Sequence, residues 1–206
     1  MSKWNEDIIH HELNLNHFRV TIFGSARIQE NDPIYQQIYN LAKEVGKHNI
    51  DIVTGGGPGL MDAANSGHQA GRTNNDSQSV GLNITLEHEQ SANKHLDIKM
   101  QFEQFSERLD SFIKLSNIVV VAPGGVGTLL ELFYTWQLIQ VKKTERKEII
   151  MLGTMWPELI EWIKTSPLKN QLMKEEDFTY IHLAKDNKEA MDIILDKYNS
   201  YKLISL

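Results

Sequence analysis

The chain has 206 residues, 41% of them hydrophobic, which suits one α/β domain with a sizeable core. Its formal net charge of −6 argues against a protein that binds nucleic acid through a basic face, although it leaves room for a small anionic ligand held by backbone N–H groups. The chain has no cysteine, which excludes disulfides, thiolate metal sites and a cysteine nucleophile and fits a reducing cytoplasm.

Two further sequence features concern membranes and export. No apolar run approaches the roughly 20 residues that a membrane span needs. Residues 1–17 are polar and charged and lack the apolar centre of a signal peptide. We therefore expect a cytoplasmic protein whose partners include neither a membrane nor a nucleic acid.

The hydrophobic pattern alternates between strand and helix periodicity along the chain. It predicts strands at 18–23, 50–54, 79–84, 97–102, 118–122, 148–152 and 178–183. It predicts helices at 33–48, 59–71, 104–116, 127–142 and 156–165, a short helix near 168–174, and a terminal helix at 187–201. This alternation indicates the α/β class, with a Rossmann-like, doubly wound parallel sheet in a single domain spanning residues 1–206.

Three of the predicted strands end in turns of glycine or small polar residues. These turns are Gly24 to Arg27, Gly55 to Gly59 and Pro123 to Thr128. Ligands of open parallel sheets bind outside the carboxyl ends of the strands. One such turn could be only a tight turn, but three of them favour a ligand site.

The third turn has the pattern of an anion site, because a strand, a glycine turn and a helix start follow one another. Free N–H groups and the helix dipole point at such a turn, and glycine lets the backbone approach a ligand closely. We expect the substrate phosphate to be bound by Gly24, Ser25, Gly56, Gly57, Gly124, Gly125, Val126, Gly127 and Thr128.

Two charged residues are the candidates for chemistry. Glu131 lies one helical turn inside the helix that follows the third turn, and a carboxylate beside a phosphate cradle indicates chemistry on a group attached to the phosphate. Arg108 has no acidic residue three or four positions away, so taken alone it is a solvated helix arginine. Beside a phosphate site it could instead orient a phosphoester. Asp62 is interpreted only as a carboxylate favoured by its helix dipole.

Several alternative sites lack their sequence signatures. No Gly-Lys-Ser/Thr P-loop occurs, and no Gly-x-Gly-x-x-Gly motif is followed by an acid at the end of the next strand, so magnesium-nucleotide hydrolysis and NAD binding are not supported. His68, His88 and His95 form no metal pattern and are interpreted as surface or loop residues. We expect neither a metal nor a cofactor.

The segment Pro123-Gly-Gly-Val-Gly-Thr-Leu-Leu-Glu131 resembles the PGGxGTxxE motif of the LOG ("Lonely guy") family, whose members are often labelled lysine decarboxylases. The segments Phe23 to Arg27 and Thr54 to Met61 are similar to two further family segments. Gly81 to Ile84, and Glu89, Gln90 and Asn93, resemble the longer bacterial branch. The resemblance extends over residues 18 to 165, whereas no pyridoxal-lysine context supports the decarboxylase label.

The resemblance implies a phosphoribohydrolase, which cleaves the N-glycosidic bond of a nucleoside 5′-monophosphate and releases a free base and ribose 5-phosphate. AMP and cytokinin nucleotides are the substrate types it implies, with Arg108 and Glu131 as the catalytic pair and Asn83, Glu89 and Met100 in the base and ribose region. Leu109 stands where the family has a lysine. The resemblance also implies a homodimer or higher homo-oligomer. The broad apolar face of helix 128–141, with Leu129, Leu132, Phe133, Trp136 and Ile139, could be shared between subunits, but plain core packing needs the same pattern.

Two other functions remain open at this point. Molybdenum-cofactor carrier proteins look similar and share glycine-rich turns, so a non-catalytic nucleotide or cofactor carrier is one of them. A signalling protein that binds nucleotide alarmones is the other. The retention of Arg108 and Glu131 favours the enzyme, while Leu109 keeps the carrier open.

Overall fold

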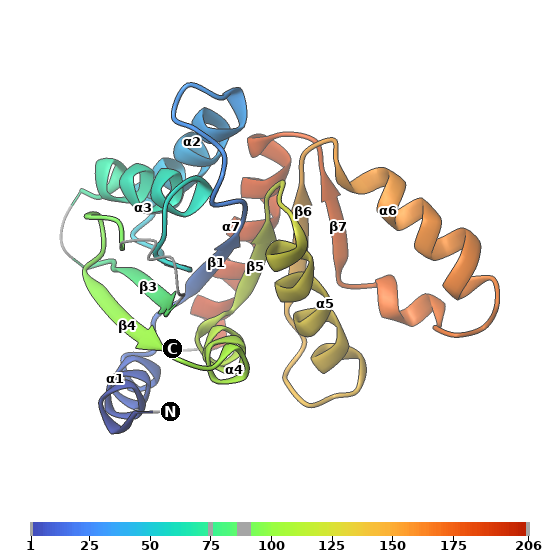
Figure 1. Ribbon diagram of the computed structural model, residues 1–206, viewed down its shortest axis with the longest axis horizontal. Helices are drawn as coiled ribbons and strands as arrows, with labels where there is room; N and C mark the ends of the chain where they lie inside the picture. Colours follow the sequence, from blue (N-terminus) through green and yellow to red (C-terminus); the bar gives the residue numbers. More distant parts are fainter. Residues whose placement is uncertain (1, 74–75, 86–91, 205–206) are drawn as a thin grey trace.

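The computed structural model describes residues 2–73, 76–85 and 92–204. Its centre is a seven-stranded sheet in the order β4-β3-β2-β1-β5-β6-β7, in which all six neighbouring pairs are parallel (Figure 1). The strands are β1 (Arg19–Phe23), β2 (Asp51–Thr54), β3 (Ser79–Ile84), β4 (Ile98–Phe102), β5 (Ile118–Val121), β6 (Glu148–Leu152) and β7 (Ile181–Ala184). The prediction of a single Rossmann-like, doubly wound parallel domain is confirmed.

Helices connect the strands and flank the sheet. They are α1 (Lys3–Asn14), α2 (Pro33–Lys47), α3 (Leu60–Gly71), α4 (Phe105–Leu115), α5 (Val126–Gln140), α6 (Trp156–Ile163) and α7 (Asn187–Ile204), with a π-helical turn at Lys164–Leu168 and a 3₁₀ turn at Glu175–Phe178. Local signals fix some of their ends: Asp32 caps α2 by accepting a hydrogen bond from the Ile34 N–H at 2.8 Å, and Pro33 follows it.

The strand order reverses at the centre of the sheet. From β1 the chain builds outward to β4, then returns to place β5 on the other side of β1 and continues outward to β7. The carboxyl ends of β1 and β5 therefore flank the switch point, where open parallel sheets bind their ligands.

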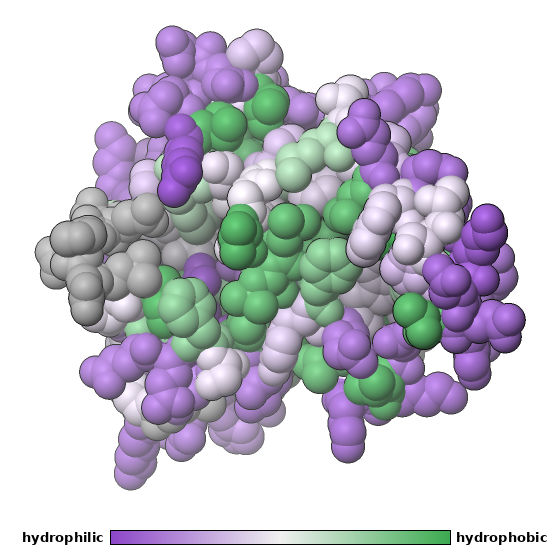
Figure 2. Space-filling model, turned by 45° about the vertical axis from the view of Figure 1, so that its right-hand side comes forward, coloured by the Kyte–Doolittle hydropathy of each residue, from purple (hydrophilic) through white to green (hydrophobic). Residues whose placement is uncertain are grey.

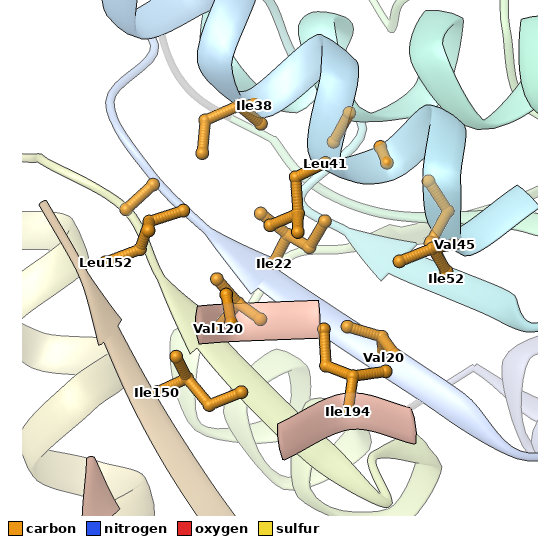
Figure 3. Packing of buried hydrophobic residues seen from close by; sticks show 14 of the residues in the cluster. Val20, Ile22, Ile38, Leu41, Val45, Ile52, Val120, Ile150, Leu152 and Ile194 are labelled. Carbon is orange, nitrogen blue, oxygen red and sulfur yellow. The ribbon is translucent and has the colours of Figure 1, made fainter. Parts of the chain in front are cut away.

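The inner strands of the sheet are buried on both faces, as is usual for a parallel sheet, whereas the edge strand β4 alternates between buried and exposed residues. One face packs against α2, α3 and α7, and Figure 3 shows Val20, Ile22 and Val120 of the sheet meeting Leu41 of α2 and Ile194 of α7. The alternate strand residues pack on the other face against α4, α5 and α6. Among the described residues, no helix has the length and apolar character needed to cross a membrane.

Helix α1 was not expected from the sequence. Its buried stripe is Asn5, Ile9 and Glu12, so two of its three buried positions are polar and the hydrophobic period is hidden. Both polar residues bind outside the helix: Asn5 Nδ2 donates to the Gln101 carbonyl at 2.7 Å, and Arg19 donates to the Glu12 carboxylate at 3.0 Å.

The region after α6 also differs from the prediction. The expected short helix near 168–174 is absent, because the chain widens into the π turn around Pro167 and residues 169–173 then form turns and bends. Proline has no N–H to donate, and the Lys169 N–H reaches back to the Lys164 carbonyl at 3.2 Å. Strand β7 consequently begins at Ile181, three residues later than expected.

His68 corrects a second expectation, since it is not a surface residue. It is fully buried on α3, and its Nε2 lies 2.9 Å from the Ile50 carbonyl. Burial is the main cause that lowers the pKa of His68 to about 4, so this imidazole is neutral. His95 lies partly exposed beside Gln69, and His88 lies outside the described residues.

Candidate active site at the carboxyl edge of the sheet

The three turns meet at the carboxyl edge of the sheet and are joined by backbone hydrogen bonds. The Ser25 N–H donates to the Pro123 carbonyl at 3.1 Å, and the Leu60 N–H donates to the Ser25 carbonyl at 2.9 Å. The turn after β1 thus holds the other two together. Gly24 allows this approach, because a Cβ there would lie 2.9 Å from the Leu60 Cβ.

The N-terminus of α5 is the open part of this edge. Gly125 is the N-cap and supplies no side-chain cap, and the N–H groups of a first helical turn have no acceptor within their own helix. A Cβ on Gly125 or Gly127 would meet no atom within 4 Å, and neither glycine has a positive φ. Neither packing nor backbone conformation therefore requires glycine at these two positions. What the two glycines provide is open space over a row of free amides, as an anion site needs.

Gly124 and Thr128 have a different role in the same turn. A Cβ on Gly124 would clash with Thr128 Oγ1, so the missing side chain lets the buried threonine hydroxyl approach the turn. Val126, between the two open glycines, exposes 84% of its surface.

Several polar groups of the other two turns are hydrogen-bonded within the protein. The Gly56 N–H donates to Thr54 Oγ1 at 2.9 Å, and the Gly57 carbonyl accepts from Asn93 Nδ2 at 3.0 Å. Ser25 uses its N–H on Pro123, and its hydroxyl accepts from the Arg27 N–H at 3.1 Å. The N–H groups of Gly56 and Ser25 thus already have acceptors within the protein, whereas the first-turn amides of α5 have none within their own helix.

Arg108 and Glu131 form a buried ion pair beside this edge. Arg108 Nη1 lies 3.3 Å from Glu131 Oε1, with 9% and 12% of the two side chains exposed. Arg108 Nε also donates to the Leu82 carbonyl at 2.6 Å, and its guanidinium carbon lies 5.0 Å from the centre of the Phe112 ring. The solvated arginine that the α4 sequence alone suggests is thus replaced by a fixed, desolvated one.

Burial changes the titration of both partners. Desolvation raises the pKa of Glu131 to about 7, although Arg108 acts in the opposite direction, and it lowers the pKa of Arg108. A carboxyl group that titrates near neutrality can both give and take a proton under ordinary conditions. A perturbed acid with a specific charged partner is a common feature of functional sites.

The residues expected near the base and ribose have separate locations. Asn83, the last residue but one of β3, is 5% exposed, and its buried Oδ1 has no hydrogen-bond partner among the described residues. It faces Gly56, where a Cβ would lie 2.5 Å from that oxygen. Met100 is fully buried in the core, so the structure does not bring it to the surface of the site. Glu89 lies outside the described residues.

Leu109, in the position of the family lysine, is 6% exposed and therefore belongs to the protein interior. Within the described segments, no group of three or more histidine, cysteine or acidic side chains is arranged to hold a metal ion. The sequence does not single out Asn65, which supports the β2–α3 turn by accepting hydrogen bonds from Thr54 Oγ1 and Asn93 Nδ2.

The chain is similar to known proteins both in sequence and in fold. The family model described as possible lysine decarboxylase matches residues 61–194. The pyrimidine/purine nucleotide 5′-monophosphate nucleosidase of Escherichia coli strain K12 is 30% identical over 122 residues, which cover 56% of this chain and 26% of that protein. The corresponding nucleosidase of Escherichia coli O157:H7 matches to the same extent. The match thus spans about a quarter of the length of these curated relatives.

Solved structures share the fold at lower identity. The molybdenum cofactor carrier protein of Chlamydomonas reinhardtii has a TM-score of 0.66 at 20% identity, covering 89% of this chain and 99% of that one. The molybdenum cofactor binding protein of Rippkaea orientalis has a TM-score of 0.62 at 16% identity, covering 87% and 96%. Because the family model extends over more than half of the sequence and includes the segment from Pro123 to Glu131, this chain belongs to the family of possible lysine decarboxylases, as its resemblance to the LOG proteins indicates.

Proposed function

We propose that the protein hydrolyses the N-glycosidic bond of nucleoside 5′-monophosphates of the AMP or cytokinin-nucleotide type, as a single nucleotide-binding domain. The observation that carries this proposal is the buried pair of Arg108 and Glu131 beside an open helix N-terminus. An anion site alone would suit any phosphate binder. A carboxyl group with a raised pKa beside it adds a group able to take part in chemistry.

The phosphate of the nucleotide binds at the start of α5 in this proposal. The amides of the first turn donate to its oxygens over Gly125 and Gly127, and the positive end of the helix dipole favours its charge. Binding energy from the phosphate, which does not react, then fixes the glycosidic bond against the catalytic pair. Asn83, whose buried Oδ1 has no hydrogen-bond partner within the described residues, is available to the ribose or the base.

The reaction adds water across the bond between C1′ and the base nitrogen. The bond breaks with its electron pair going to the base, which gains a proton, and the water oxygen becomes bonded to C1′ after losing a proton. Positive charge builds on the ribose ring as the bond opens, as in glycoside hydrolysis. Glu131 stabilises that charge, holds a ribose hydroxyl or accepts the proton of water, while Arg108 orients the ribose phosphate or assists the leaving base.

The substrate class follows from the family and from the chemistry of the site. The Escherichia coli relatives are named as nucleosidases of pyrimidine and purine nucleotide 5′-monophosphates, which is the same reaction. The test is to incubate the purified protein with AMP, GMP, CMP, UMP, IMP and N6-isopentenyl AMP and to follow base and ribose 5-phosphate by chromatography. Release of base that is lost in Glu131→Gln supports the proposal, and release that persists in this variant overturns the proposed mechanism.

A carrier function is the alternative outcome of the same experiment. The fold similarity to molybdenum cofactor carriers and the absence of the family lysine at position 109 favour it. Stoichiometric nucleotide binding without release of base from any of the six nucleotides would establish the carrier. Leu109→Lys is then the first variant to assay, since it restores the second cation beside Arg108.

We also propose that the protein forms a homodimer through α5. This helix is apolar on its outer as well as its inner side, whereas a surface helix is normally polar outside. Val126, Leu130 and Phe133 follow one another along its outer side with 84%, 44% and 41% of their surfaces exposed. Figure 2 shows hydrophobic side chains gathered across the middle of one face of the molecule. A contiguous apolar patch of this kind is typical of an interaction site.

A further inference from the structure

A buried carboxamide on α3 joins three other segments of the chain. Asn65 has no exposed surface, and its Oδ1 accepts hydrogen bonds from Thr54 Oγ1 at 2.8 Å and from Asn93 Nδ2 at 2.9 Å. Its Nδ2 donates to Ser79 Oγ at 2.7 Å. Because two donors converge on one atom, the orientation of the amide is determined by the network.

The same network holds the glycine turn between β2 and α3 at three points. Thr54 Oγ1, while donating to Asn65, accepts from the Gly56 N–H at 2.9 Å. Asn93 Nδ2 donates to the Gly57 carbonyl at 3.0 Å, and the Asn93 N–H donates to the Gly56 carbonyl at 2.8 Å. Both Thr54 and Asn93 are oriented by Asn65, so the two side-chain contacts among these three depend on the Asn65 carboxamide.

The glycine turn between β2 and α3 also confines Arg108. A Cβ on Gly55 would clash with Arg108 Nη2, so the backbone of the turn lies directly against the guanidinium. The Leu82 carbonyl binds Nε and the Phe112 ring lies 5.0 Å from the guanidinium carbon, which leaves Nη1 directed at Glu131. A small displacement of the turn would free one side of the guanidinium.

We infer that Asn65 is a positioning residue, which keeps the Gly55–Gly59 turn against Arg108 and thereby holds the guanidinium toward Glu131. The inference rests on the proposed function for its catalytic consequence, but the geometric part stands independently of it. The hydrogen bonds of Asn65 within the described part of the chain go to Thr54, Asn93 and Ser79, so it reaches Arg108 and Glu131 only through the residues that hold the turn. Buried polar networks with every member satisfied specify one arrangement, and a missing member leaves its partners unsatisfied.

The test uses variants matched in size and position. Asn65→Leu removes all three hydrogen bonds of the carboxamide with little change in volume, and Thr54→Val removes the hydroxyl that links it to Gly56. Thr54→Ser keeps that hydroxyl. The control for damage to α3 is His68→Gln, because His68 is equally buried on the same helix but is bonded at the other end of β2, to Ile50.

We expect Asn65→Leu and Thr54→Val to lower kcat by about tenfold or more at temperatures where circular dichroism shows them folded, since misplacing a catalytic group is costly. Binding of ribose 5-phosphate, which uses the start of α5, should change by no more than about twofold. Thr54→Ser and His68→Gln should keep the wild-type kcat. Unchanged kcat in Asn65→Leu, or an equal loss in His68→Gln, overturns the inference.

A second readout does not require enzymatic activity, so it separates this inference from the proposed function. The Glu131 carboxyl carbon is followed by ¹³C NMR over pH in each variant. If Asn65 holds Arg108 in place, its removal weakens the ion pair and raises the titration midpoint of Glu131, whereas Thr54→Ser and His68→Gln leave that midpoint unchanged. A midpoint that does not move in Asn65→Leu refutes the inference, even if the wild-type protein releases no base.

Discussion

Arg108 on α4 and Glu131 on α5 lie 23 residues apart in the chain, yet their side chains form an ion pair of 3.3 Å in the protein interior. The pair is not an isolated contact, because Arg108 is also bonded to the Leu82 carbonyl and confined by the turn after β2. Burying two charges is expensive unless their geometry is fixed. A fixed pair with a raised carboxyl pKa, beside free helix amides, is a costly arrangement for a merely structural purpose.

The first prediction concerns the catalytic role of this pair. Glu131→Gln keeps the size of the side chain and its hydrogen bond to Arg108 but cannot exchange a proton or become negative. We expect base release to fall by roughly 10²–10⁴-fold, the range of a lost acid or base. Chromatographic assays of base and ribose 5-phosphate measure it, with Glu161→Gln on the exposed side of α6 as a control that should keep full activity.

The same variant should alter how stability depends on pH. Burial raises the folded pKa of Glu131 to about 7 from an ordinary 4.5, so between these values the unfolded chain loses the proton while the folded one keeps it. Stability from this group is therefore present below about 4.5 and is lost as the pH rises through 7. Urea unfolding over this range should show that the unfolding free energy of Glu131→Gln increases relative to that of the wild type as the pH rises. A constant difference would contradict the raised pKa.

A third prediction separates binding from folding at α5. Gly127→Ala adds a methyl group where no atom lies within 4 Å, in a helical position where alanine is favoured by about 0.5–1 kcal/mol. The variant should melt at or above the wild-type temperature and yet bind ribose 5-phosphate more weakly, as calorimetry would show. Gly24→Ala is the contrasting variant, because its Cβ would lie 2.9 Å from Leu60 and should lower the melting temperature. If Gly127→Ala binds ribose 5-phosphate as tightly as the wild type does, the first turn of α5 is not part of the phosphate site.

Much of this architecture is predictable, because the signals that determine it are local. Apolar runs, glycine turns and helix periods predict all seven strands and the order of the connecting helices, since each is a property of a few consecutive residues. Helix α1 has no such local signal, because its buried residues Asn5 and Glu12 are polar and bind Gln101 and Arg19 outside the helix. The turns after α6 are not predicted either, because the position at which a helix widens around Pro167 has no periodic signal.

The candidate site is likewise predictable where its signals are local and unpredictable where it depends on tertiary contacts. The motif from Pro123 to Glu131 is contiguous, so the sequence indicates a phosphate turn and a nearby carboxylate. The sequence cannot show that Arg108 is buried, because its partner lies on another helix and only neighbours three or four residues away can be examined. Nor can it single out Asn65, whose role consists entirely of tertiary hydrogen bonds.

His68 provides a prediction about acid stability. Its folded pKa of about 4 lies below the ordinary 6.5, mainly because of burial, so between these values the unfolded chain binds a proton that the folded chain does not. Stability should therefore fall as the pH drops from about 6.5 to about 4. His68→Gln removes this titration, and its unfolding free energy should change less over that range than the wild-type value. Parallel pH profiles of the two proteins would rule out the contribution of His68.

Glu148, at the start of β6, should affect the stability of the protein at a lower pH than His68 does. Burial alone would raise its pKa, but hydrogen bonds from His182 and Lys197, both at 2.7 Å, together with Arg146 outweigh it and lower the pKa to about 2. The stability from this cluster is present above the ordinary pKa of 4.5 and is lost as the pH falls toward 2. Glu148→Gln should be less stable than the wild type at pH 7 by thermal melting, and the difference should shrink below pH 4.5. A difference that persists at pH 2 would show that packing, rather than charge, is responsible.

The last prediction tests the homodimer proposed on the outer side of α5. Phe133 is 41% exposed there, and a charge at this position would have to be buried without a partner if a second copy packs on the helix. Phe133→Glu should therefore give a monomer in size-exclusion chromatography with light scattering, where the wild type gives a dimer. Gln137→Glu places the same charge on the next exposed turn and shows how far the interface extends. A monomeric wild type would refute the dimer, and the exposed valine, leucine and phenylalanine of α5 would then have to be covered by a different protein.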